Sequence, residues 1–337
     1  MRIGMTGTNF VSDFFMAAAR EVPEIQVTAV TSGHRAHADA FAAKYGIPEV
    51  YDSLEDMLEK AKLDAVYLPV PNLLHHDMTI ACLQRHLAVI TEKPFAVTPQ
   101  QAAEMFAVSA QENAYVHDAI VPLYTDHFQQ LKQELGRVGR IRRAVISFSK
   151  YSSRYDAYLR GENPPTFRPE LCNGSWMDLG IYCVADAVGL FGKPLAVQAS
   201  AIKLDSGADC QGAAILHYDG FDAVLLHSKV TDTGILSEIE GEEGTLTFDV
   251  PSLISHIWYT RRPHAGEKTE KILLSAEGGN PFACQLRDFV RSRAEGRPES
   301  ALVPHRLSLD ILETLTQCRT QAGVVFPADA QEGKEHA

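Results

Sequence analysis

Residues 2–20, RIGMTGTNFVSDFFMAAAR, decide the fold expected for this chain. Residues 2–7 form a short apolar run that ends in Gly7, and the segment after it carries Phe14, Phe15 and Ala18 at helical spacing. This order predicts a strand, a tight turn and a helix. The same alternation continues along the chain, with strands predicted at 26–31, 65–68, 87–91 and 115–120 and helices at 36–45, 73–83 and 99–110.

The order of the predicted strands and helices divides the chain into two domains. Strands that alternate with helices pair in parallel through right-handed crossovers, so residues 1–121 are predicted to form a Rossmann domain with a doubly wound parallel sheet. Beyond Pro122 one helix, 123–135, precedes a series of strand-like runs separated by turn pairs such as Asp219-Gly220. Strands are predicted at 141–149, 195–202, 212–217, 223–230, 236–240, 245–248 and 253–259, and helices at 177–190, 281–293 and 306–321.

This second pattern predicts an α+β domain over residues 122–328, with an open, mostly antiparallel sheet that binds substrate and carries oligomer contacts. An uncovered sheet face predicts a homodimer or homotetramer. Residues 329–337 contain no apolar residue larger than alanine and are predicted to fray.

Composition excludes several classes of partner. The chain has 337 residues, of which 45% are hydrophobic and 22% charged, and its net charge of −12 gives it no electrostatic attraction to nucleic acid or to an anionic membrane. No apolar run is long enough to span a bilayer and no signal-peptide layout opens the chain, so a cytoplasmic protein is expected. The six cysteines form no C-x-x-C pair and the histidines have no metal-ligand spacing, which predicts reduced thiols and no metal site.

The turn after the first strand, Gly7-Thr8-Asn9-Phe10-Val11-Ser12, is a candidate nucleotide site. A dinucleotide fold favours G-x-G-x-x-G, because small residues let the backbone approach a pyrophosphate at a helix N-terminus. Only Gly7 matches outright, although Asn9 tolerates a left-handed backbone and Ser12 is small. Gly7, Thr8, Asn9, Phe10 and Val11 are therefore candidate cofactor contacts, and the alternative is a plain strand-to-helix turn.

The end of the second predicted strand bears on the choice of nicotinamide cofactor. It has no Asp or Glu to hold a ribose 2′-hydroxyl, whereas Ser32, His34 and Arg35 offer donors to a 2′-phosphate. This favours NADP(H) over NAD(H). In the alternative interpretation Arg35 only caps a solvated helix start.

Three further motifs carry a family resemblance: Pro71-Asn72 followed by His75, Glu92-Lys93-Pro94 after a predicted strand, and the block from Gly174 to Tyr182, GSWMDLGIY. With these motifs in this order, the chain resembles the Gfo/Idh/MocA oxidoreductases. The match to G-x-x-x-D-x-G-x-[HY] has tyrosine, as in glucose-fructose oxidoreductase and the dihydrodiol dehydrogenases. The resemblance implies cofactor contacts from Pro71, Asn72, His75, Glu92 and Lys93, and a Lys93–Pro94 bond that is often cis.

Two groups of residues are candidates for catalysis. Lys93, at the carboxyl edge of a parallel strand, faces the crevice where such sheets bind ligands and is suited to exchange a proton with a substrate hydroxyl or carbonyl. Asp178 and Tyr182 are four residues apart, so an α-helix places a carboxylate that orients hydroxyls beside a phenol. The structural alternatives are a surface lysine paired with Glu92, a carboxylate at a helix start and a packed tyrosine.

A loop rich in hydroxyl groups, aromatic rings and arginine lies between the two catalytic groups in sequence. Its residues Tyr151, Arg154 and Arg168 suit a sugar or polyol, which bind through ring stacking and hydrogen bonds. An oligomer contact is the alternative role for this loop.

Together these residues predict an NAD(P)-dependent dehydrogenase or reductase acting on CH–OH groups. Its substrate would be a secondary alcohol or hemiacetal carbon of a sugar, polyol or diol, contacted by Lys93, Asp178 and Tyr182. Two alternatives stay open: an enzyme that recycles a tightly bound cofactor during glycoside cleavage or epimerisation, and a non-catalytic regulator that senses cofactor or sugar.

Overall fold

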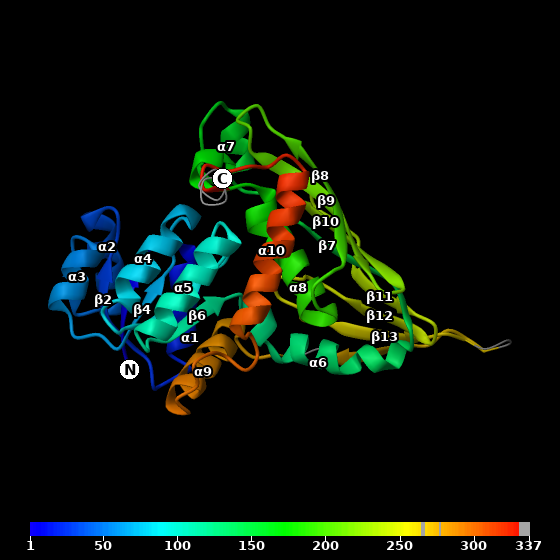
Figure 1. Ribbon diagram of the computed structural model, residues 1–337, viewed down its shortest axis with the longest axis horizontal. Coiled ribbons are helices and arrows are strands. Elements are labelled where there is room, and N and C mark those ends of the chain that lie inside the picture. The colour runs from blue at the N-terminus through cyan, green and yellow to red at the C-terminus, as the bar shows by residue number, and fades with distance from the viewer. Residues whose placement is uncertain (264–266, 276–277, 330–337) are drawn as a thin grey trace. The chain divides into compact units, whose positions relative to one another are not determined.

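The structure is a computed structural model that describes residues 1–263, 267–275 and 278–329 (Figure 1). The chain forms two compact units. The first contains Met1–Tyr124 and Gly279–Ser308, and the second contains Thr125–Gly278 and the chain from Leu309 onward. The sequence prediction placed a boundary at 121–122, close to the first crossing, but it anticipated no return of the chain to the first unit.

The first unit is built on a parallel sheet with the strand order β3-β2-β1-β4-β5-β6, which confirms the predicted doubly wound fold. Its strands are β1 (Arg2–Thr6), β2 (Gln26–Thr31), β3 (Glu49–Tyr51), β4 (Ala65–Leu68), β5 (Ala88–Glu92) and β6 (Val116–Ala119). Its helices are α1 (Phe10–Ala19), α2 (Arg35–Tyr45), α3 (Leu54–Lys60), α4 (His75–Leu83), α5 (Pro99–Gln111) and α9 (Pro281–Ala294), with 3₁₀ turns η1 (Asn72–Leu74) and η2 (Val121–Tyr124).

The order of the strands places the ligand-binding edge. The chain winds outward in one direction from β1 to β3 and in the other from β4 to β6, so the switch point lies between β1 and β4. Open α/β sheets bind ligands at the carboxyl ends of strands beside this point. The residues after β1 and β5, including Gly7 and Lys93, follow strands that end at that edge.

Helix α9 completes the core of the first unit although it follows the second sheet in sequence. Its Ala283, Leu286 and Phe289 belong to the buried cluster that contains Ile3 and Phe15. Each of these side chains is removed from water, which is the main source of stability for such a sheet.

The second unit contains a larger sheet, in the order β14-β13-β12-β11-β7-β10-β9-β8. The pair β7–β10 is parallel and the other pairs are antiparallel, so the prediction of a mostly antiparallel sheet is confirmed. The strands are β7 (Ile141–Ser149), β8 (Ala196–Lys203), β9 (Asp209–Tyr218), β10 (Phe221–Ser228), β11 (Ser237–Gly241), β12 (Gly244–Phe248), β13 (Ile257–Arg261) and β14 (Lys271–Ser275).

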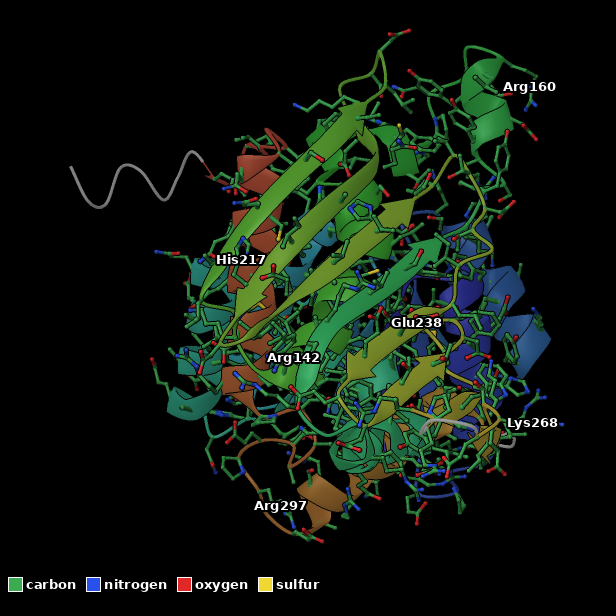
Figure 2. The ribbon with its side chains drawn as sticks, turned by 90° about the vertical axis from the view of Figure 1, so that its right-hand side faces the viewer. Arg142, Arg160, His217, Glu238, Lys268 and Arg297 are labelled. Carbon is green, nitrogen blue, oxygen red and sulfur yellow. The ribbon has the colours of Figure 1, made fainter. Side chains whose placement is uncertain are left out.

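The remaining elements cover or connect this sheet. They are α6 (Asp126–Glu134), α7 (Tyr155–Leu159), α8 (Ile181–Phe191), α10 (His305–Gln321), the 3₁₀ turns η3 (Leu135–Val138), η4 (Pro165–Phe167) and η5 (Pro169–Leu171), and the π-helix η6 (Trp176–Gly180). Helix α8 packs on β7 and β10. Figure 2 is turned toward the sheet's other face, with His217 of β9 and Glu238 of β11 labelled.

One predicted strand is shorter than expected at its start. The strand predicted at 253–259 begins only at Ile257, because a turn in which the Ser255 hydroxyl donates to Asp249 Oδ2 at 2.5 Å occupies the residues before it. The predicted frayed tail begins at Asp329, whose carboxylate accepts from the buried Arg319 guanidinium at 2.5 and 2.7 Å. The rest of the predicted tail, residues 330–337, lies outside the described residues.

Candidate active site

The turn after β1 needs glycine at position 7. Gly7 has a φ of +114°, and a Cβ there would lie 2.6 Å from the backbone oxygen of Pro69. Its N–H donates to Thr31 O at 2.8 Å, which ties the end of β1 to the end of β2. Close approach of backbone at a sheet's carboxyl edge is what a bound pyrophosphate requires.

The residues that replace the other two glycines of the usual motif fix this turn through their side chains. Asn9 is the N-cap of α1: its Oδ1 accepts from Val11 N at 2.9 Å and its Nδ2 donates to Pro69 O at 2.9 Å. The Ser12 hydroxyl donates to Gly7 O at 3.0 Å. The departure from G-x-G-x-x-G is thus compensated by hydrogen bonds, and the N-terminus of α1 retains the dipole that favours an anion.

The predicted 2′-phosphate residues lie beside this turn. Thr8 Oγ1 donates to Ser32 Oγ at 3.4 Å, so the structure brings these two together. Arg35 opens α2, where its guanidinium binds Asp39 at 2.9 Å and Asp52 at 2.7 Å on the surface. His34 is the N-cap residue of α2 but makes no side-chain capping bond.

Phe10 and Val11 begin α1, and the two differ in exposure. Phe10 is 70% exposed and meets Phe14 edge-on, with ring centroids 6.0 Å apart. Val11 is half-buried. An aromatic side chain left this open beside the glycine turn is available to a ligand.

The carboxyl end of β5 carries Glu92 and Lys93. Glu92 is buried and accepts from the Tyr67 hydroxyl at 2.6 Å. Burial raises the pKa of Glu92, while the Tyr67 hydrogen bond and the nearby Lys93 charge act against that rise. Lys93 is half-buried, and the Lys93–Pro94 peptide is cis, as the family resemblance implied.

His75 lies beneath this turn. It is fully buried, with Nδ1 2.8 Å from Pro94 O and Nε2 2.9 Å from Val70 O. Burial lowers its pKa. The ring thus connects the segment containing Pro71 and Asn72 with the turn at Lys93, which is a positioning role.

In the second unit, the GSWMDLGIY block does not begin as the predicted α-helix. Residues Trp176–Gly180 form a π-helix, and α8 follows it directly. The Asp209 carboxylate accepts from Trp176 N at 2.7 Å, and burial raises the pKa of Asp209 to about 6. A Cβ on Gly174 would meet Asp209 Oδ1 at 1.9 Å and one on Gly180 would meet Trp176 Cε3 at 2.7 Å, which explains both glycines of the motif. Single π turns inside helices are frequent at functional sites.

Asp178 projects from this π turn and binds a lysine that sequence reasoning missed. Lys229, in the loop after β10, is only 3% exposed in its side chain, and its Nζ donates to Asp178 Oδ2 and to Thr166 Oγ1. The Asp178 side chain is 44% exposed. The Asp178 carboxylate is therefore open to solvent, whereas its counter-charge on Lys229 is buried. No motif in the sequence singles out Lys229, because it lies inside the strand predicted at 223–230.

Tyr182 follows on the first turn of α8. It is half-buried, and its ring stands edge-on to Phe148 of β7, with centroids 5.7 Å apart. Asp178, Tyr182 and Lys229 all belong to the second unit, whereas Lys93 belongs to the first.

The predicted substrate loop connects to this group through aromatic rings. The Tyr151 hydroxyl donates a hydrogen bond to Asp156 at 2.7 Å, and the Tyr151 ring packs edge-on against Tyr155. The Tyr155 ring packs edge-on against Phe167. The centre of the Phe167 ring lies 5.8 Å from Lys229 Nζ. The two arginines of the prediction contact other groups. Arg168 binds Glu170 at 2.7 Å, and Arg154 is the residue before α7.

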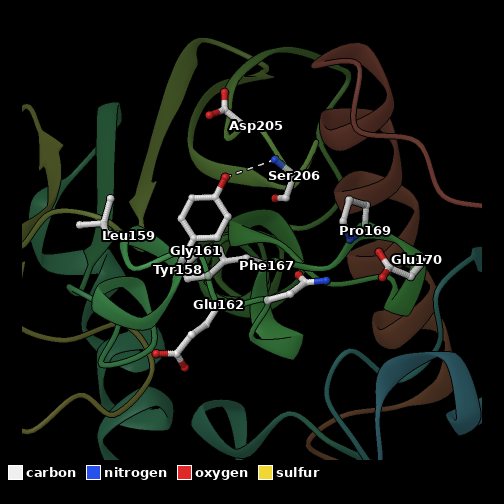
Figure 3. A pocket seen from close by; sticks show the side chains of 10 residues that line it. Tyr158, Leu159, Gly161, Glu162, Phe167, Pro169, Glu170, Asp205 and Ser206 are labelled. Carbon is white, nitrogen blue, oxygen red and sulfur yellow. Dashed lines mark hydrogen bonds between the residues drawn. The ribbon is translucent and has the colours of Figure 1, made fainter.

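A cavity of about 600 Å³ opens beside Phe167 (Figure 3). Tyr158 lines this cavity, and its hydroxyl oxygen accepts a hydrogen bond from Ser206 N at 3.2 Å. The other lining residues include the carboxylates Glu162, Glu170 and Asp205.

The described residues offer neither a cluster of metal ligands nor a membrane-spanning helix. No group of three or more His, Cys, Asp or Glu side chains in the described part of the chain is placed to hold a metal ion. None of the helices among residues 1–263, 267–275 and 278–329 is long and apolar enough to cross a membrane.

Comparison with protein families gives two matches. Residues 1–119 match the oxidoreductase family with an NAD-binding Rossmann fold, and residues 128–247 match the GFO/IDH/MocA C-terminal domain.

Known proteins match over nearly the full length. The chain is 35% identical to scyllo-inositol 2-dehydrogenase (NADP(+)) IolU of Bacillus subtilis, across 98% of this chain and 99% of that protein. It is 36% identical to the uncharacterized oxidoreductase YgjR of Escherichia coli, with the same coverage. Among solved structures, the 3-ketoreductase KijD10 of Actinomadura kijaniata, in complex with NADP and TDP-benzene, superposes with a TM-score of 0.84 over 95% of this chain and 97% of that one. At 22% identity this shows a shared fold.

Proposed function

The chain belongs to the GFO/IDH/MocA oxidoreductase family, and from this premise we propose that it transfers hydride between NADP(H) and a secondary alcohol or hemiacetal carbon of a sugar, polyol or diol. The observation that carries the proposal is the Asp178–Lys229 pair. A half-exposed carboxylate whose counter-ion is buried accepts hydrogen bonds from substrate hydroxyls without a large desolvation cost. Tyr182, four residues further along and on α8, would supply a phenol.

The chemistry of the first unit supports NADP(H) as the cofactor. Gly7 and the α1 N-terminus would hold the pyrophosphate, and Thr8 and Ser32 would meet the 2′-phosphate. Arg35 is engaged by two surface carboxylates, but exposed ion pairs contribute little free energy, so a phosphate dianion can replace them. The related IolU is itself named as an NADP(+) enzyme.

The proton-transfer roles fall to Lys93 and Tyr182. When bound, the nicotinamide ring accepts or donates the hydride. Lys93 follows β5 at the ligand-binding edge and would exchange a proton with the reacting oxygen, while the buried Glu92 and His75 fix its turn. Asp178 would orient the neighbouring hydroxyls, and the carboxylates and rings beside Phe167 suit the rest of a sugar.

The experiment is a fluorescence titration with NADPH and NADH, followed by turnover assays on inositols, aldoses and cyclic diols. We expect tighter binding of NADPH, turnover of at least one polyol, and a loss of turnover of about 100- to 10,000-fold in Lys93→Met with unchanged NADPH affinity. Near-normal turnover in Lys93→Met would overturn the assignment. Binding of NADPH without turnover on any substrate would favour a regulator, and retention of cofactor through each cycle would favour the internally recycling enzyme.

We also propose that the open face of the second sheet forms the contact in a homo-oligomer. Val224 of β10 lies opposite Ile215 of β9 and Val145 of β7, on the face away from α8. All three are half-buried apolar side chains in one row across the sheet. A second copy of the chain would remove this row from water.

A further inference from the structure

The buried ammonium of Lys229 holds two side chains, a carboxylate and a hydroxyl. Its Nζ donates to Asp178 Oδ2 and, at 2.5 Å, to Thr166 Oγ1. The lysine side chain is 3% exposed, whereas the Asp178 side chain is 44% exposed and Thr166 is half-buried. All three residues belong to the second unit. Two groups that share one ammonium lie close together, and both residues here are more exposed than the charge that holds them.

The Thr166 hydroxyl keeps its own proton. An ammonium has no lone pair, so Thr166 Oγ1 accepts from Lys229 and cannot donate to it. Among the described residues, Lys229 Nζ is the one hydrogen-bond partner of this oxygen, so the Thr166 proton has no acceptor in that part of the chain. A hydroxyl whose oxygen accepts from a charged donor is polarised and becomes a stronger donor itself. Thr166 therefore offers a donor next to a carboxylate that accepts.

The backbone around Thr166 is held in place before any ligand binds. Thr166 is the middle residue of η4, and the two residues before it, Pro164 and Pro165, have φ fixed by their rings. Phe167 N donates to Pro164 O and Asn173 Nδ2 donates to Pro165 O, each at 3.0 Å. Phe167 itself lines the cavity of Figure 3. A group positioned in advance loses less entropy when it contacts a ligand.

We propose that Thr166 is a specificity-determining residue, which donates a hydrogen bond to a substrate oxygen next to the hydroxyl that binds Asp178. This assignment rests on the proposed function and narrows the substrate to a compound with oxygens on two neighbouring carbons, because Asp178 and Thr166 contact the same nitrogen. An ionised carboxylate only accepts, and the Thr166 hydroxyl donates, so the two groups assign different roles to the two oxygens. An alcohol without the second oxygen leaves the Thr166 proton without an acceptor and binds more weakly.

The test measures binding by calorimetry on the whole protein saturated with NADPH. The probes are myo-inositol, scyllo-inositol, methyl xyloside and trans-cyclohexanediol, each compared with its monodeoxy analogues. No hydride moves in these complexes, because the alcohol and the cofactor are both reduced, so the result does not depend on turnover. For a parent polyol that binds, we expect the wild type to bind one monodeoxy analogue about tenfold more weakly. Thr166→Val should bind the parent about tenfold more weakly than the wild type does and show no preference for the parent over that analogue.

Two further variants serve as controls. Thr166→Ser keeps the hydroxyl and should recover most of the affinity. Thr231→Val removes a hydroxyl whose proton is already donated to Ser228 Oγ at 2.8 Å, and it should bind the parent as the wild type does. The NADPH titration should be unchanged in all three variants, which shows that each of them folds.

Two results would overturn the assignment. One is wild-type affinity of Thr166→Val for the parent polyol. The other is an equal loss of affinity for the parent and for every monodeoxy analogue, which is the result expected if Thr166 only supports Lys229. Failure of every parent polyol to bind the wild type would instead contradict the proposed function and, with it, this assignment.

Discussion

Gly7 shows how one residue controls the nucleotide edge. Gly7→Ala places a methyl group 2.6 Å from a backbone oxygen at a left-handed φ, so both sterics and backbone strain oppose it. We expect the free energy of unfolding to fall by about 1–3 kcal/mol and NADPH affinity to fall with it. Urea denaturation and NADPH titration measure the two effects.

The matched control is Gly33→Ala. Gly33 lies two residues after β2, and a Cβ there would have no atom within 4 Å. This variant should keep wild-type stability, and an equal loss in both variants would refute the steric argument.

Lys229 is the clearest test of the proposed substrate contacts. Lys229→Met removes the ammonium that binds Asp178, so the hydroxyls of the proposed substrate would lose a fixed acceptor. We expect kcat/KM to fall by about 100-fold, mainly through KM, with little change in NADPH affinity. Lys229→Arg, which keeps the charge, should recover part of this loss.

A surface lysine of the same unit provides the comparison. Lys203 donates to Gly323 O on the outside of the molecule, and Lys203→Met should leave the kinetic constants unchanged. Equal effects of the two Met variants would mean that the loss reflects general charge and not the bond to Asp178.

Sequence reasoning found residues with local signals and missed those defined by long-range contact. Gly7 and Lys93 were predicted because each sits beside a recognisable strand. Lys229 lies 51 residues from Asp178 in sequence, and nothing in its neighbourhood indicates burial. The hydrogen bonds by which Asn9 and Ser12 replace glycines were likewise invisible before Pro69 and Gly7 were placed in space.

Among elements, the edge strand β6 buries a carboxyl group. Burial raises the pKa of Asp118 from its ordinary value of 3.8 to about 7, and its Oδ1 has no partner among the described residues. The folded protein therefore holds a proton on Asp118 that the unfolded chain releases near pH 4. Stability from this group is present below pH 4 and is lost as the pH rises to 7.

The prediction compares Asp118→Asn with the wild type. Relative to the variant, the wild type should lose on the order of 4 kcal/mol of unfolding free energy between pH 4 and pH 8. Urea denaturation at several pH values measures this difference. Parallel pH profiles for the two proteins would show that Asp118 is not protonated in the fold.

Short elements were the ones the sequence pattern missed. Strand β3 has three residues and α3 has seven, too few to establish a hydrophobic period. Ser53, whose hydroxyl accepts from Asp56 N at 3.0 Å, was a usable signal for the start of α3. The π-helix could not be foreseen, because it depends on Asp209, Trp176 and His227 meeting from three separate segments.

At the scale of the whole molecule, the open sheet face makes a prediction about assembly. Val224→Lys places a charge in the middle of the apolar row and should convert an oligomer to a monomer in light-scattering measurements. Val325→Lys, at an exposed apolar residue after α10, is the control and should leave the mass unchanged. A monomeric wild type would refute the proposed contact.

The late position of α9 has a consequence for how the protein is made. The core of the first unit includes Phe289, which the ribosome adds after all the strands of both sheets. Until then the apolar surface that α9 covers stays open, although domains near the start of a chain usually fold first during synthesis. The nascent N-terminal half must therefore wait, exposed to chaperones and proteases, until translation has passed through the second unit.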